Sequence, residues 1–182
     1  KSTDKGNTWI LLYPDPSEIN GLVAKGDHAE EVIFMKDSSE RDVLAMVVDP
    51  SDSKKLYAAI AINKKTALYI SDNGGAKWNK ERELPEDVKN IFIDPSSPKE
   101  NRSLFITGSN GITQKVNGSW KENLMPKDVA KLTTFSAGYD EKQKKFIIYA
   151  ISGKSYFNPD GDKSGIYYTD NGGLTWENRQ DG

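Results

Sequence analysis

The sequence predicts an all-β fold made of consecutive four-stranded antiparallel sheets. Two observations support this prediction: all four tryptophans end related octapeptides, and short apolar runs alternate with turn residues along most of the chain. Helical periodicity is nearly absent, and five Asn-Gly pairs favour the positive φ angles of tight hairpin turns.

The octapeptides follow the pattern Ser/Thr-x-Asp/Asn-x-Gly-x-Thr-Trp. Those at 2–9, 71–78 and 169–176 keep most of it, whereas the one at 113–120 keeps the frame and has lost most of the signature. The residues assigned to the pattern are Ser2, Asp4, Gly6, Thr8, Trp9, Ser71, Asn73, Gly75, Trp78, Trp120, Thr169, Asn171, Gly173, Thr175 and Trp176. This recurrence predicts a repeat architecture.

Each repeat is predicted to contribute four strands. The first strand ends at an acidic turn that begins at Asp49, Asp94 or Asp140, and the second strand follows that turn. The third strand runs into the octapeptide, as at 67–71, and the fourth begins at the Trp, as at 9–13. The repeating unit is therefore strand, acidic turn, strand, strand, octapeptide, strand.

The whole chain, residues 1–182, is expected to be a single segment of such units. They lie at about 43–81, 89–123 and 132–182, and 1–13 contributes an outer strand only. Segment 14–42 is much longer than the usual connection of about 2–6 residues, so we expect an insertion there, with an extra strand at its Glu-Glu-Val-Ile-Phe-Met stretch.

The octapeptides resemble the Asp-box (BNR) repeat of β-propellers, which occurs in sialidases, xyloglucanase-like glycoside hydrolases, sortilin-type receptors and photosystem assembly propellers. The resemblance implies a β-propeller of four-stranded antiparallel blades, with about three blades plus one outer strand present. A closed propeller has about four to eight blades, so we expect a segment of a larger propeller, or copies that assemble into a ring. The box residues are expected to be structural, with the Asp or Asn closing the turn and each Trp filling space between sheets.

The resemblance also implies that function lies at the strand ends opposite the box turns. Two long loops fall there, at 14–43 and 153–165, and aromatic rings beside carboxylates suit sugars. The ligand-binding candidates are His28, Tyr156, Phe157 and Asn158, and the catalytic candidates are Asp27, Glu30, Asp160 and Asp162.

Each candidate has a simpler alternative. Asp160 and Asp162 could end a hairpin, or join Asn158 in a partial calcium loop that lacks the acid at its far end. His28 could be a solvated loop residue or a proton shuttle. Acidic pairs could serve as the acid and base of a glycosidase, which requires carboxyl groups roughly 5–9.5 Å apart.

Composition excludes several classes of protein. With 25 basic and 27 acidic residues the net charge is −2, which gives no general attraction to nucleic acid. No apolar run reaches the ~18 residues of a membrane-inserted helix, and the lack of Cys removes disulfides and thiolate chemistry. Only four arginines are present, and none has the Arg-Ile-Pro setting expected of a sialidase. Apart from calcium, no cofactor is expected.

Together these features predict a segment of a secreted, periplasmic or cell-surface protein that binds or processes glycans in a glycoside hydrolase-like way. A polysaccharide or glycan is the expected ligand, and further blades or other copies of the chain are the expected protein partners. If the protein is an enzyme, two carboxylates would act, and this segment alone is not expected to be catalytic. The alternative is a non-catalytic propeller that serves as a scaffold for protein–protein interaction.

Overall fold

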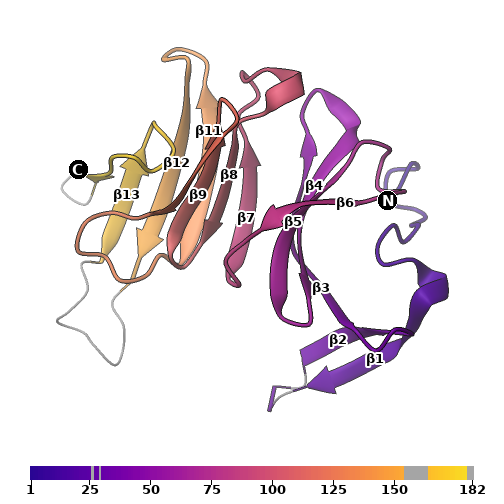
Figure 1. Cartoon of the computed structure of the whole chain (residues 1–182). Coiled ribbons are helices and arrows are strands. Elements are labelled where there is room, and N and C mark those ends of the chain that lie inside the picture. The colour runs from indigo at the N-terminus through magenta and orange to yellow at the C-terminus, as the bar shows by residue number, and fades with distance from the viewer. Residues whose placement is uncertain (26, 29, 154–163, 180–182) are drawn as a thin grey trace. The chain divides into compact units, whose positions relative to one another are not determined.

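The computed structural model describes residues 1–25, 27–28, 30–153 and 164–179 (Figure 1). Within these ranges the regular secondary structure is almost entirely β, with fourteen strands and two 3₁₀ helices of three residues each. The strands form one six-stranded and two four-stranded antiparallel sheets. The chain divides into two compact units, Lys1–Glu86 and Asp87–Gly182, which are described separately.

The first unit contains the six-stranded sheet, in which each strand pairs with the next one along the chain. A short 3₁₀ helix, η1 (Pro16–Glu18), precedes it. The strands are β1 (Ile19–Lys25), β2 (Glu30–Met35), β3 (Glu40–Asp49), β4 (Asp52–Ile62), β5 (Lys65–Ser71) and β6 (Asn79–Glu83). The central strands β4 and β5 are the most apolar, and their Ile60 and Leu68 are fully buried.

This sheet differs from the sequence expectation because the insertion at 14–42 becomes part of it. The expected extra strand is β2, which forms a hairpin with β1 and pairs with β3 through Ile33–Arg41 and Phe34–Glu40. The hairpin supplies hydrogen-bond partners to the edge of β3, which would otherwise be unpaired. The first sheet therefore has six strands rather than four.

The prediction of an outer strand at 9–13 is wrong, because the structure has no strand there. These residues join none of the described sheets. Instead, the backbones of Lys1 and Ile10 bond to each other, with the Ile10 N–H donating to the Lys1 carbonyl at 2.8 Å and the terminal amine of Lys1 donating back at 2.6 Å. The backbone N–H and carbonyl groups of Ile10 therefore bond within the N-terminal segment, and no described strand pairs with this apolar run.

The second unit contains two four-stranded sheets, again with sequential strands. The 3₁₀ helix η2 (Lys99–Asn101) lies in the connection between the first two strands. The first sheet comprises β7 (Val88–Ile93), β8 (Leu104–Gly108), β9 (Gly111–Val116) and β10 (Ser119–Leu124), and the second comprises β11 (Thr134–Asp140), β12 (Lys145–Ser152), β13 (Gly165–Thr169) and β14 (Glu177–Asn178). Both match the strand number predicted for one repeat.

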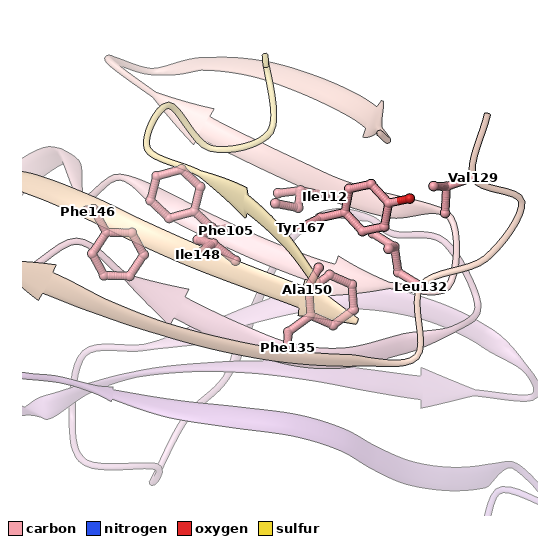
Figure 2. Packing of buried hydrophobic residues seen from close by; sticks show 9 residues of the cluster. All are labelled: Phe105, Ile112, Val129, Leu132, Phe135, Phe146, Ile148, Ala150 and Tyr167. Atoms are coloured by element: carbon pink, nitrogen blue, oxygen red, sulfur yellow. The ribbon is translucent and has the colours of Figure 1, made fainter. Parts of the chain in front are cut away.

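The core of the second unit joins its two sheets (Figure 2). Phe105 of β8 stacks on Phe146 of β12, with ring centroids 5.0 Å apart and ring planes 9° apart. Strand β12 alternates strictly: Ile148 on the inner face is fully buried, whereas Tyr149 and Ile151 on the outer face are each 44% exposed. Both faces of β12 are apolar, but only one of them faces this core.

The predicted acidic turns are confirmed in all three repeats. A side-chain oxygen of Asp49, Asp94 or Asp140 accepts a hydrogen bond from a backbone N–H two residues later, at 2.9, 2.8 and 2.8 Å. This local bond closes the turn between the first and second strands of each repeat.

Candidate functional site

Three of the four octapeptides, at 2–9, 71–78 and 169–176, form turns with the same hydrogen bonds. The Ser or Thr hydroxyl at the first position accepts the backbone N–H of the Gly at the fifth position, at 2.8, 2.9 and 2.9 Å. The side-chain oxygen at the third position accepts the N–H of the seventh residue, at 2.9, 2.8 and 3.0 Å. These turns, called box turns below, use their polar atoms internally, which is the mark of a structural element.

Asp4, the one acid at the third position of a box turn, is held in its ionised form. The backbone N–H and the hydroxyl of Thr8 donate to its carboxylate at 2.9 and 2.7 Å, and the Ser2 hydroxyl donates at 2.9 Å. In that order, these bonds lower the pKa of Asp4 to about 2. Such a carboxyl carries no proton to donate at neutral pH, so it is unsuited to general acid catalysis.

The divergent octapeptide, which ends at Trp120, forms a different turn. Strands β9 and β10 are joined by Asn117 and Gly118 alone, with φ angles of 50° and 77°. Positive φ at both central residues is characteristic of a two-residue hairpin turn, and here Ser119 pairs directly with Val116. The loss of the sequence signature therefore corresponds to a shorter connection.

The tryptophans do not all play the expected part. Trp176 packs against the core of the second unit, and Trp78 lies edge-on to Tyr13 with ring centroids 6.2 Å apart. Trp9 is 74% exposed, so the expectation that each Trp fills space between sheets is wrong there. Residues 9–13 join no described sheet, and the indole N–H of Trp9 donates to the Gly6 carbonyl at 3.0 Å.

Among the predicted site residues, the structure brings Asp27 and His28 together as an open surface pair. They lie in the β1–β2 connection, with Nε2 of His28 and Oδ1 of Asp27 3.8 Å apart and side chains 85% and 92% exposed, respectively. Solvent screens the interaction between two side chains as exposed as these. The exposed position of His28 does not form an enclosed site in which it could transfer a proton to a substrate. Glu30 begins β2, and its side chain lies outside the described residues.

The other predicted site residues also lie outside the described residues. They are the ligand-binding candidates Tyr156, Phe157 and Asn158, and the catalytic candidates Asp160 and Asp162. The calcium loop predicted from Asn158, Asp160 and Asp162 falls in the same segment. Within the described ranges, no group of three or more His, Asp or Glu side chains is placed to hold a metal ion.

A polar cluster at the strand ends opposite the box turn of the second unit was not expected from the sequence. Oδ2 of Asp87 accepts the backbone N–H of Ser109 at 3.1 Å, and Nζ of Lys89 donates to the Thr133 carbonyl at 3.0 Å. Contact with Ser109, together with the charges of Lys89 and Lys131, holds the pKa of Asp87 below its usual range. Asp87 therefore has a fixed position as a hydrogen-bond acceptor. In the sequence, the one feature that could have indicated this role is that Asp87 lies directly before a predicted strand.

No described helix has the length and apolar character that a membrane crossing requires. No protein-family model and no curated protein matches the sequence.

Similarity to known proteins is found among solved structures. A crystal structure of an ancestral GH74 enzyme matches with a TM-score of 0.55 and 14% identity, covering 95% of this chain and 26% of that one. The GH74 enzyme of Niastella koreensis is 19% identical over 82% of this chain and 24% of its own, with a TM-score of 0.49. This chain spans about a quarter of the length of these structures. The predicted all-β fold of the β-propeller class is confirmed.

Proposed function

We propose that this chain is an Asp-box segment of a secreted β-propeller that binds or processes glycans. The observation that carries the proposal is the structural match to an ancestral GH74 enzyme over 95% of the chain. The shared hydrogen bonds of the three box turns support the Asp-box assignment. Because this fold occurs in both enzymes and binding proteins, the fold alone does not identify the activity, which depends on the residues at the strand ends.

The glycan would bind at the strand ends opposite the box turns. The hydroxyl and carboxylate oxygens of the box turns already accept hydrogen bonds from the backbone of the same turns, so few of them are available to bind a ligand. Two long connections of the sequence follow strands at the opposite ends, 125–133 after β10 and 153–164 after β12, and the second contains Tyr156 and Phe157. The fixed acceptor Asp87 lies at the same ends of the second unit. Aromatic rings stack on the C–H faces of sugars, and an ionised carboxylate accepts hydrogen bonds from sugar hydroxyls.

The described residues favour binding over catalysis by this segment alone. A glycosidase needs one carboxyl with a raised pKa as its acid and a second roughly 5–9.5 Å away. The pKa of Asp87 is lowered, and Asp27 is an exposed residue beside His28. Neither of these two described carboxyls fits the acid of a glycosidase, and the catalytic candidates Asp160 and Asp162 lie outside the described residues.

The test is binding of the protein to soluble polysaccharides, measured by electrophoresis through gels that contain xyloglucan, β-glucan or mannan. A Tyr156→Ala, Phe157→Ala double variant should lose retardation by a glycan that retards the unmodified chain. Tyr149→Ala, which removes an exposed ring from the outer face of β12, is the matched control and should keep it. Equal retardation of all three proteins, or none for any glycan, would contradict the proposal.

The second candidate function, a scaffold for a protein partner, rests on one observation. The outer face of the sheet β11–β14 exposes Tyr149, Ile151 and Ile166, each more than two-fifths accessible. An apolar face of this kind marks a surface for protein contact. This reading predicts no affinity for any polysaccharide, and loss of a protein contact in Ile151→Asp.

A further inference from the structure

The core of the second unit shows how two sheets of this chain pack on each other (Figure 2). The earlier sheet, β7–β10, contributes Phe105 and Ile112, which lie on the same face of the neighbouring strands β8 and β9. The later sheet, β11–β14, contributes a row that includes Phe135, Ile148 and Ala150. The contact therefore joins two different surfaces, called below the covering face of the earlier sheet and the receiving face of the later one.

The six-stranded sheet of the first unit also has a receiving face. Its box turn begins at Ser71, which pairs with Leu56 of β4. The box turn of the last sheet begins at Thr169, which pairs with Ile148 of β12. Leu56 and Ile148 therefore hold the same place in the two sheets. Since Ile148 belongs to a receiving face, the row that contains Leu56 is the receiving face of the first sheet.

This receiving face is exposed along β3. Met46 of β3 pairs with Ala58, the next residue of β4 on this face. Its counterpart in the last sheet is Phe135 of β11, which pairs with Ala150. Phe135 is 7% exposed, whereas Met46 is 57% exposed. The exposed apolar residues of the receiving face on β3 are Val43, Met46 and Val48.

A groove of about 520 Å³ lies beside Met46, between β3 and the N-terminal segment. Met46 and Val43 line it from the strand, and Ile10 and Leu12 line it from the segment. Among the described residues that line the groove, only Lys1 is charged. The receiving face and this groove therefore form one apolar surface, and apolar surfaces of this kind mark sites of protein contact.

The box-turn glycines show which part of a covering sheet this groove lacks. A Cβ atom at Gly173 would lie 3.0 Å from Leu124 of β10 and 3.3 Å from Ile112 of β9. At Gly75, which holds the same position in its own box turn, the three nearest atoms would all belong to Leu12. Leu12 thus stands where Leu124 does, but β10 is paired with β9, and the segment of Leu12 pairs with no described strand. The groove is open at the place that corresponds to β9.

The last sheet carries a covering face that is exposed. Its receiving face is buried in the core of the second unit, so the opposite side of β12 and β13 is its covering face. These are the second and third strands of their sheet, as β8 and β9 are of theirs. Tyr149, Ile151 and Ile166 on this side are 44%, 44% and 46% exposed, respectively. They line a hollow of about 410 Å³, which has room for an apolar side chain such as that of Met46.

One chain thus carries both halves of a contact that it already forms once between its own sheets. We infer that copies of this chain bind head to tail, with the covering face of the last sheet of one copy packed on the receiving face of the first sheet of another. The end repeats of an array need a polar outer face to stay apart in water, and here both end sheets present apolar rows instead. Because the two halves differ, the contact is heterologous. It uses neither Tyr156 nor Phe157 and does not depend on glycan binding.

The test is sedimentation velocity of the full chain over a wide range of protein concentrations. The average mass of the unmodified chain should rise with concentration. Met46→Lys and Ile151→Lys each place a charge in an apolar contact, so each should weaken self-association at least about tenfold. Leu174→Lys is the matched control, because Leu174 is 48% exposed in a box turn and belongs to neither face. It should associate as the unmodified chain does.

A mixture of the two variants distinguishes head-to-tail binding from association through one kind of face. Met46→Lys keeps an intact covering face, and Ile151→Lys keeps an intact receiving face. The mixture should therefore form a dimer of one copy of each variant and nothing larger, since the two faces left free both carry a charge. If copies associated through one kind of face alone, one of the two variants would associate as strongly as the unmodified chain.

The proposal is overturned if the unmodified chain stays monomeric at every concentration, which would leave a different polypeptide as the occupant of these faces. It is also overturned if either lysine variant alone associates as strongly as the unmodified chain, or if the mixture of folded variants gives no dimer. Circular dichroism shows whether the variants fold. Met46→Gln and Ile151→Gln, which add a polar group without a charge, replace them in the same experiment if they do not.

Discussion

The hydroxyl of Ser71 accepts a hydrogen bond of 2.9 Å from the backbone N–H of Gly75, and this bond is buried. Ser2 and Gly6 make the corresponding bond at 2.8 Å, but there it is exposed to solvent. The same local geometry therefore occurs in two environments, and the energetic value of the two bonds should differ.

Ser71→Ala should lower the free energy of unfolding by about 1–3 kcal/mol, because it leaves the buried N–H of Gly75 without an acceptor. Ser2→Ala should cost no more than about 0.5 kcal/mol, since water replaces the lost hydroxyl. Urea denaturation of the two variants measures the difference. Equal losses would mean that the burial of the box turn does not matter.

Gly172→Ala should be more damaging than Gly74→Ala. Both glycines hold the same position in a box turn, with φ angles of 70° and 73°. Both substitutions force alanine into the left-handed region at about 1–2 kcal/mol, but only the Cβ at 172 meets Gln114 and Phe105 at 2.3 Å. The excess loss for Gly172→Ala, about 1–3 kcal/mol in thermal or urea denaturation, measures the clash. Equal stability of the two variants would contradict the close approach of this turn to the sheet.

The stability of the first box turn should depend on pH through Asp4. Folding lowers the pKa of Asp4 from 3.8 to about 2, so the folded state binds its proton less tightly than the unfolded chain does. Its stabilising contribution is therefore complete above pH 3.8, declines as the pH falls from there, and is lost below about 2. NMR titration of the Asp4 carboxyl carbon should give a midpoint near 2. A midpoint close to 4 would mean that the bonds from Thr8 and Ser2 are absent in solution.

The two faces of β12 should respond differently to truncation. Ile148→Ala removes a fully buried side chain of the core and should cost about 2–5 kcal/mol. Ile151→Ala, on the outer face and 44% exposed, should cost less than about 1 kcal/mol in the isolated chain. The comparison is made by urea denaturation at low protein concentration, where no second molecule can cover the outer face. A large loss for Ile151→Ala would show that this face is covered in solution.

Much of the fold was predictable because its determinants are local. The octapeptides and the acidic turns close through bonds between residues two to four positions apart, so their sequence alone reveals them. In β12, by contrast, both faces are apolar, so the sequence predicts a strand but not which of its faces is buried. Residues 9–13 show the limit of this reasoning, because an apolar run becomes a strand only where another strand can pair with it.

The burial of Gln114 against a box turn could not have been predicted from the sequence. The alternation of β9 puts Gln114 on the same face as Ile112 and Val116, but a glutamine does not by itself indicate burial, whereas the structure leaves it 3% exposed. Its burial depends on Gly172, which belongs to the other sheet. The pairing of Asp87 with Ser109 is hidden for a similar reason, since the two residues come from different connections. Contacts between separate elements are set by tertiary packing, which no local pattern contains.

Strands that follow one another along the chain also pair with one another in every described sheet. Each sheet is therefore a short meander, and bringing its strands together requires the closure of only small loops, which costs little entropy. We expect hairpins such as β8–β9 to form early in folding and the stacking of Phe105 on Phe146 to form late, since these residues come from separate sheets. A chain built in this way gains its structure sheet by sheet, and its rate-limiting event is the meeting of sheets that have already begun to form.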